Sequence, residues 1–175
     1  LRSVGSRGTE PGTFFRPNGV AIHGDLLFVS ERDNRRVQVL RFPDFSPVAV
    51  LGEGELRSPY GVWVHEAAPG ELIVYVTDSF QDGARFDIVP PLDQLDQRVR
   101  HYRLRIGHGD RVETQSLGSF GDTSEANALR IVESIAGDPV FDRLLVADED
   151  MRHGQTVHEY TLDGRHTGRK LPAGT

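Results

Sequence analysis

Acidic side chains recur in this sequence at one kind of place, the end of a short apolar run. The residues in these positions are Glu31, Asp33, Asp78, Asp82, Asp148, Glu149 and Asp150, and Glu133 stands at the start of a further run. Carboxylates that converge on one point repel each other, which raises their pKa values unless a hard cation neutralises the charge. Calcium suits such a cluster better than zinc does, because calcium takes about six to eight oxygen ligands in flexible geometry. The recurrence therefore predicts a ligand or metal site, and the alternative is that each residue only caps a turn in solvent.

Arginine and tyrosine side chains lie near the same points of the sequence. Arg32 follows Glu31 directly, and Arg85 lies in an insertion, residues 79–97, between two apolar runs. A guanidinium group binds phosphate oxygens in a rigid bidentate manner, so both arginines are candidate substrate-binding residues; the alternative for each is a solvated surface charge. Tyr60 precedes a Gly-Val step, where we expect either its hydroxyl group to reach a ligand or its ring to pack.

An internal repeat indicates the elements that position these side chains. Residues 17–22 (PNGVAI) return as residues 59–64 (PYGVWV), and residues 133–137 are a more diverged third copy. Each copy precedes a near-continuous apolar run and then an alternating run, which predicts short antiparallel strands, the first of these runs being buried on both faces. A period of roughly 40 to 50 residues is typical of a propeller or solenoid. The predicted fold class is therefore all-β, a β-propeller, since a sandwich gives no reason for the repeated opening.

The repeat divides the chain into blades at residues 17–52, 59–120 and 131–170, with residues 1–15 as the end of a preceding blade. Propellers close with about four to eight blades. Three blades and part of a fourth do not close a ring, so we expect either a piece of a longer protein or a ring completed by self-association with a second copy.

Composition narrows the classes of partner. The chain has 20 Lys and Arg against 26 Asp and Glu, a net charge of −6, and no cysteine. The lack of cysteine excludes disulfide scaffolds, thiolate zinc sites and cysteine nucleophiles. The acidic balance and scattered basic residues predict no nucleic acid partner, and the lack of a long apolar run predicts no membrane span.

The first repeat resembles an NHL repeat, on residues 17–22 together with residues 27–40 (LFVSERDNRRVQVL). NHL repeats form the blades of many six-bladed binding propellers. This resemblance implies a non-catalytic propeller that binds a protein or a small ligand.

A second resemblance covers roughly residues 58–165 and rests on residues 132–138 (VESIAGD), residues 144–150 (LLVADED) and residues 75–77 (YVT). These segments resemble the β-propeller phytases, which are six-bladed, calcium-dependent and commonly secreted, and which hydrolyse phosphate monoesters of inositol hexakisphosphate. Two family motifs of earlier blades are absent, as is the phosphate-binding lysine that the family has just after the position of Thr77.

The phytase resemblance implies roles for four of the candidate residues: Glu133 and Tyr60 are the expected catalytic residues, and Glu133, Asp148 and Glu149 are expected calcium ligands. Asp78, which recurs at the equivalent position, is a further expected calcium ligand. Arg32 and Arg85 are the expected contacts to a small phosphorylated substrate because of their guanidinium groups. The leading prediction is therefore a calcium-dependent phosphomonoester hydrolase that is extracellular or periplasmic. The alternatives are the NHL-like binding propeller and a lactonase-type metal propeller, which shares the carboxylate mouth.

Overall fold

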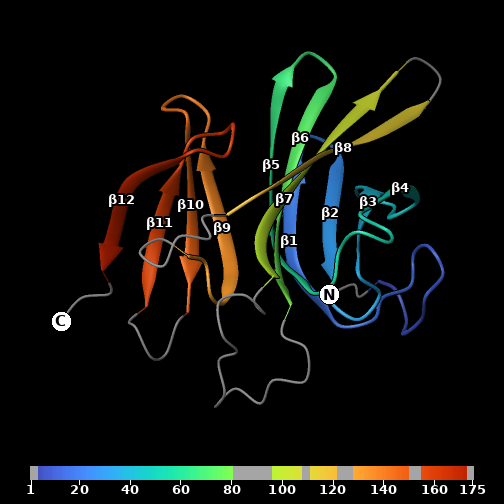
Figure 1. The fold of residues 1–175 in the computed structure, drawn as a ribbon. Coiled ribbons are helices and arrows are strands. Elements are labelled where there is room, and N and C mark those ends of the chain that lie inside the picture. The colour runs from blue at the N-terminus through green and yellow to red at the C-terminus, as the bar shows by residue number, and fades with distance from the viewer. Residues whose placement is uncertain (1–3, 81–95, 108–110, 122–127, 150–154, 173–175) are drawn as a thin grey trace.

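The computed structural model describes residues 4–80, 96–107, 111–121, 128–149 and 155–172. In this part of the chain the regular secondary structure consists of strands, arranged in three four-stranded antiparallel sheets (Figure 1). The all-β prediction is confirmed. The described residues contain no helix of the length and hydropathy needed to cross a bilayer.

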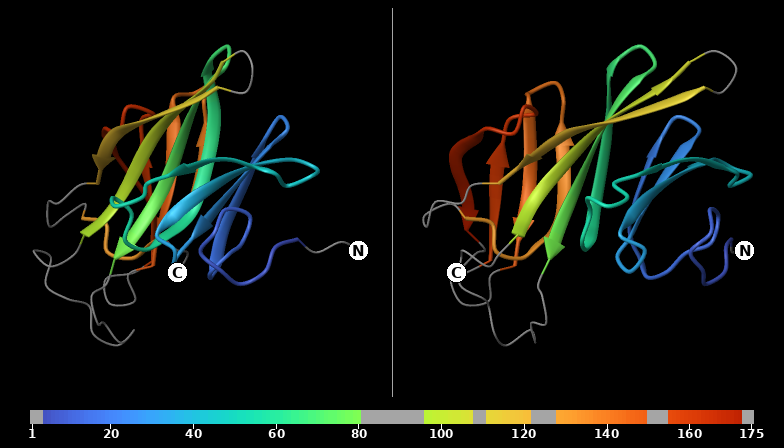
Figure 2. Two further views of the ribbon diagram at one scale, coloured as in Figure 1. Left: turned by 90° about the vertical axis from the view of Figure 1, so that its right-hand side faces the viewer. Right: turned by 45° about the vertical axis from the view of Figure 1, so that its right-hand side comes forward.

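Each sheet is built from four consecutive strands that pair in chain order. Sheet 1 consists of β1 (Pro17–His23), β2 (Leu26–Glu31), β3 (Arg36–Arg41) and β4 (Pro47–Leu51). Sheet 2 consists of β5 (Pro59–Ala68), β6 (Glu71–Phe80), β7 (Asp96–Ile106) and β8 (Val112–Phe120). Sheet 3 consists of β9 (Val132–Asp138), β10 (Arg143–Asp148), β11 (Thr156–Tyr160) and β12 (His166–Pro172). The three sheets follow one another side by side, with sheet 2 in the middle (Figure 2).

The first strands of neighbouring sheets approach closely. The Ser30 hydroxyl group accepts a hydrogen bond from the Gly19 N–H at 2.8 Å and donates to the Tyr60 carbonyl of sheet 2. Sheet 2 repeats this arrangement, because Thr77 Oγ1 accepts from the Gly61 N–H at 2.7 Å and donates to the Glu133 carbonyl of sheet 3 at 3.1 Å. We call these two hydroxyl contacts the inter-sheet clips.

Glycine is required where the clips bring the backbones together. A Cβ atom at Gly61 would lie 2.7 Å from the Glu133 carbonyl oxygen, closer than real Cβ contacts. The glycine of the repeated Gly-Val step thus allows the first strands to pack.

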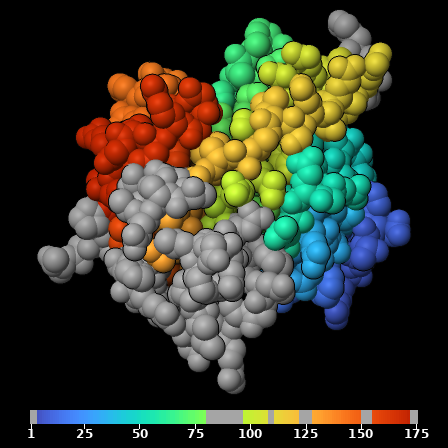
Figure 3. All heavy atoms as spheres, in the orientation of Figure 1, coloured from blue at the N-terminus to red at the C-terminus, as the bar shows by residue number. Residues whose placement is uncertain are grey.

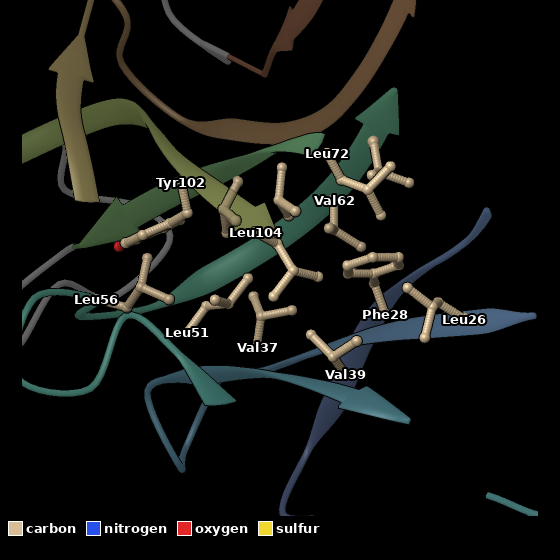
Figure 4. Close-up of a cluster of buried hydrophobic side chains, with 13 residues drawn as sticks. Leu26, Phe28, Val37, Val39, Leu51, Leu56, Val62, Leu72, Tyr102 and Leu104 are labelled. Atoms are coloured by element: carbon tan, nitrogen blue, oxygen red, sulfur yellow. The ribbon is translucent and has the colours of Figure 1, made fainter. Parts of the chain in front are cut away.

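Two hydrophobic clusters join the sheets. The cluster between sheets 1 and 2 consists of Leu26, Phe28, Val37, Val39, Leu51, Leu56, Val62, Val64, Leu72, Val74, Val76, Tyr102 and Leu104 (Figure 4). The cluster between sheets 2 and 3 consists of Ile73, Tyr75, Val99, Leu129, Val132, Leu144, Val146 and Tyr160. Alternate residues of β6 belong to the two clusters, which explains why this strand is apolar along its length and confirms the predicted burial on both faces.

Candidate functional site

The recurring carboxylates occupy one register position at the end of the second strand of each sheet. Glu31 pairs across the sheet with Pro17, Asp78 pairs with Pro59, and Asp148 pairs with Val132. All three side chains are buried, and a buried charge must be paired and hydrogen-bonded to be tolerated.

Glu31 binds the chain that enters sheet 1. Its Oε1 accepts from the Phe15 N–H at 2.8 Å and from Asn34 Nδ2 at 2.8 Å. Its Oε2 accepts from Arg36 Nε at 2.6 Å and from Gln38 Nε2 at 2.8 Å. Both carboxylate oxygens are thus satisfied within the sheet and its incoming connection.

Asp78 has the same role in sheet 2. It accepts from the backbone N–H groups of Arg57 and Ser58 at 3.0 and 2.7 Å, and from Arg100 Nε at 2.9 Å.

In sheet 3, Asp148 accepts from the backbone N–H groups of Arg130 and Ile131 at 3.0 and 2.7 Å, and His158 Nε2 lies 3.6 Å from its Oδ2. Each of the three acids therefore holds the chain segment that enters its sheet, and this structural role explains why an acid recurs at this position. The structure places Asp78 and Asp148 in separate anchors rather than in one cluster.

His158 is a residue of this framework that the sequence analysis missed. His158 lies on the third strand of sheet 3, where it pairs with Val146 of the second strand. The equivalent pairs are Gln38 with Val29 in sheet 1 and Arg100 with Val76 in sheet 2, so the three residues share one register position. The Gly168 N–H donates to His166 Nδ1 at 2.9 Å, and His166 Nε2 lies 3.3 Å from His158 Nδ1. His158 Nε2 lies 3.0 Å from Thr156 Oγ1 and 3.6 Å from Asp148 Oδ2. The shared register position of the three residues was the signal that could have identified it.

The residues that follow the anchors form a second repeated set. The backbone N–H groups of Arg32, Ser79 and Glu149 donate to carbonyl oxygens of the entering chain, those of Arg16, Ser58 and Ile131, at 3.1, 3.0 and 2.8 Å. Irregularities in the first strands place Tyr60 and Glu133 at the same end of their sheets. We call Arg32, Tyr60, Glu133 and Glu149 the rim cluster.

Two carboxylates of the rim cluster face each other in sheet 3. Burial raises the pKa of Glu133 above its ordinary value, and the negative charge and hydrogen bonding of Glu149 raise it further, whereas the positive charge of Arg32 lowers it. Both glutamates line a pocket of about 340 Å³, together with Asp148, Ala147, Val157 and Leu171 among others. A pair of carboxylates in this environment favours a shared proton or a bound cation.

The other half of the rim cluster connects sheets 1 and 2. The Arg32 guanidinium carbon lies 5.3 Å from the centre of the Tyr60 ring, a cation–π contact. Four of the predicted site residues are therefore brought together from three sheets. Arg85 lies outside the described residues, as do Asp82 and Asp150.

Two carboxylates of the rim cluster are candidate ligands for a calcium ion. Among the described residues, no three side chains of His, Cys, Asp or Glu lie close enough together to hold a metal ion. Glu133 and Glu149 fit calcium as carboxylate ligands, and the remaining oxygens of a coordination shell of about six to eight must come from water, backbone carbonyls or other residues.

No protein-family model matches the chain, and no curated protein is similar to it in sequence.

Proposed function

We propose that the three sheets are successive blades of a β-propeller, and that the rim cluster is part of a calcium-dependent site that hydrolyses phosphate monoesters. The chain-order pairing in each sheet, the adjacent first strands and the repeated inter-sheet clips support the propeller. The observation that carries the functional proposal is the contact between Glu133 and Glu149 in a pocket, with Arg32 close enough to affect the pKa of Glu133.

Each rim residue has a role that its chemistry allows. Glu133 and Glu149 hold the cation, and Arg32 binds phosphate oxygens through its guanidinium group. The Tyr60 ring holds the Arg32 side chain in place. A bound calcium ion would offset the negative charge of the phosphate and lower the pKa of a water molecule.

The test is release of inorganic phosphate from phytate with and without calcium. We expect calcium-dependent release by the protein, a loss of at least tenfold in Glu133→Gln and Glu149→Gln, and normal rates in Glu113→Gln, whose exposed carboxylate lies beside Arg111 on another hairpin. Absence of release at saturating calcium would contradict the proposal. Hydrolysis of a sugar lactone in place of phytate would favour the lactonase-type alternative.

A second candidate is a non-catalytic NHL-like binding propeller. The commitment of Asp78 and Asp148 to framework anchors favours it, because among the described residues that leaves Glu133 and Glu149 as the carboxylates in contact at the rim. This candidate predicts the same thermal midpoint in calcium and in EDTA, whereas a calcium site predicts stabilisation by calcium.

A further inference from the structure

An apolar surface lies on the side of sheet 1 that faces away from sheet 2. Val20 and Ile22 of β1 are 68% and 61% exposed. Ala21 lies between these two residues and packs against the cluster between sheets 1 and 2, so Val20 and Ile22 point to the opposite side. We call Val20 and Ile22 the sheet-1 outer face.

In sheet 2, the face that is equivalent to the sheet-1 outer face is covered by another sheet. The register positions of Val20 and Ile22 are occupied in sheet 2 by Val62 and Val64, since each pair faces equivalent residues of the second strand. Val62 and Val64 are only 7% and 8% exposed, because sheet 1 packs on them. The covering surface is the face of sheet 1 that carries Phe28.

Sheet 3 presents an equivalent of that covering surface at the other end of the molecule. Leu145 and Ala147 alternate with two residues of the cluster between sheets 2 and 3, so they face away from sheet 2. Val157 and Leu171 line the same pocket as Ala147, and Leu171 is exposed. We call Leu145, Ala147, Val157 and Leu171 the sheet-3 outer face. Figure 3 shows sheets 1 and 3 at opposite sides of the molecule.

The sheet-3 outer face differs from the internal faces in having a charged border. By register, Arg143 replaces the buried Leu26 of sheet 1, and Glu159 replaces the buried Val39. An apolar centre with a polar rim is typical of an interface between subunits.

The sheet-3 outer face also lacks the inter-sheet clip. Ala147 stands at the register position of Ser30 and Thr77, so this position supplies no hydroxyl group for a clip. Contact at this face would therefore form without the inter-sheet clip.

We propose that the sheet-1 outer face packs on the sheet-3 outer face of a second copy of this chain. The contact is head to tail, and when two such contacts close, the pair of chains forms a ring of six sheets. A ring of this size lies within the range of about four to eight blades of known propellers. The proposal rests on the propeller part of the proposed function, and the sheet-3 outer face borders the rim cluster, because Ala147, Val157 and Leu171 line the same pocket as Glu133 and Glu149.

The first test is the mass of the purified chain in solution, measured by light scattering over a range of concentrations. We expect a dimer, and we expect Ile22→Glu and Leu145→Lys to be monomers with unchanged far-ultraviolet circular dichroism. Val140→Glu is the matched control, because Val140 is 83% exposed in the turn between β9 and β10, off both outer faces, and this variant should remain a dimer. A monomeric wild-type chain at all concentrations overturns the proposal.

The second test separates head-to-tail contact from pairing of like faces. Mixing Ile22→Glu with Leu145→Lys leaves one contact intact and places opposite charges in the other, so we expect the mixture to form a dimer. If Leu145→Lys alone is still a dimer, the sheet-1 outer face pairs with itself and the proposal is wrong.

Discussion

The two interfaces between sheets have the same register and different chemistry. The interface between sheets 1 and 2 is mainly aliphatic, with Phe28 at its centre. The interface between sheets 2 and 3 contains a series of rings in contact, Trp63, His65, Tyr75, His101, Phe120 and Tyr160, with successive centroids 5.2 to 6.0 Å apart. One geometry thus accepts either a mainly aliphatic core or an aromatic core that includes two histidines.

Phe28→Ala should have the largest effect on the aliphatic interface. Removal of a fully buried ring leaves a cavity and lowers the free energy of unfolding by about 3 to 5 kcal/mol. Phe141→Ala is the control, because Phe141 is exposed in a turn and its removal should cost no more than about 0.5 kcal/mol. Urea denaturation measures both, and equal losses would show that the aliphatic cluster is not a packed core.

Gly137→Ala should disturb the aromatic interface next most strongly. A Cβ atom at Gly137 would overlap the Trp63 ring, and overpacking of this kind costs about 1 to 3 kcal/mol. Trp63 is the only tryptophan of the chain, so its fluorescence reports the change directly. In Gly107→Ala, where the nearest atom to the new Cβ would lie at 3.6 Å, the spectrum should be unchanged.

Tyr75→Phe should have a smaller effect that depends on alkaline pH. The Tyr75 hydroxyl group donates to the Leu162 carbonyl at 2.9 Å, and loss of this bond costs about 1 kcal/mol. Burial raises the pKa of Tyr75 to about 12. The unfolded state therefore ionises first, so stability falls as the pH rises from about 10 to 12.

The check on Tyr75 is thermal unfolding across that pH range. The midpoint of Tyr75→Phe should fall less steeply with pH than that of the wild type. Parallel curves would show that Tyr75 is not responsible for the alkaline loss.

Lowering the pH should destabilise the aromatic interface between sheets 2 and 3 slightly more than the aliphatic interface between sheets 1 and 2. Burial lowers the pKa of His65 and of His101 below the ordinary value for histidine. The unfolded state takes up these protons more readily, so their contribution to stability is present above about pH 6.5 and declines as the pH falls below it. His101→Phe keeps a ring in the stack and removes one of these groups.

Amide hydrogen exchange at pH 7 and pH 5 tests this difference. We expect acid to lower the protection factors, which correct for the slower intrinsic exchange at pH 5, in β6 and β9 more than in β2, and His101→Phe to reduce this loss of protection. Equal losses of protection in all three strands would contradict the role of the buried histidines.

The sequence was sufficient to predict the strands but not the roles of the acids. Repetition and local alternation identify strands, because both depend on neighbours in the chain. The direction in which Asp148 points depends on Ile131, whose N–H reaches the carboxylate only after the strands have paired. The sequence also did not predict that Ile22 is exposed, because the residues beside it in the sequence resemble those beside the buried Val64.

The rim cluster was predictable residue by residue but not as a group. Glu133 and Glu149 were both candidates, and the pairing of β9 with β10 brings them together. The contact between Arg32 and Tyr60 joins two sheets and has no local signal in the sequence.

Calorimetric titration of the protein with calcium is the most direct test of the role of Glu133 and Glu149. We predict saturable binding by the wild-type protein and by Glu113→Gln, with at least tenfold weaker binding by Glu133→Gln and by Glu149→Gln. Absence of binding by the wild type, or undiminished binding by both rim variants, would contradict the calcium site.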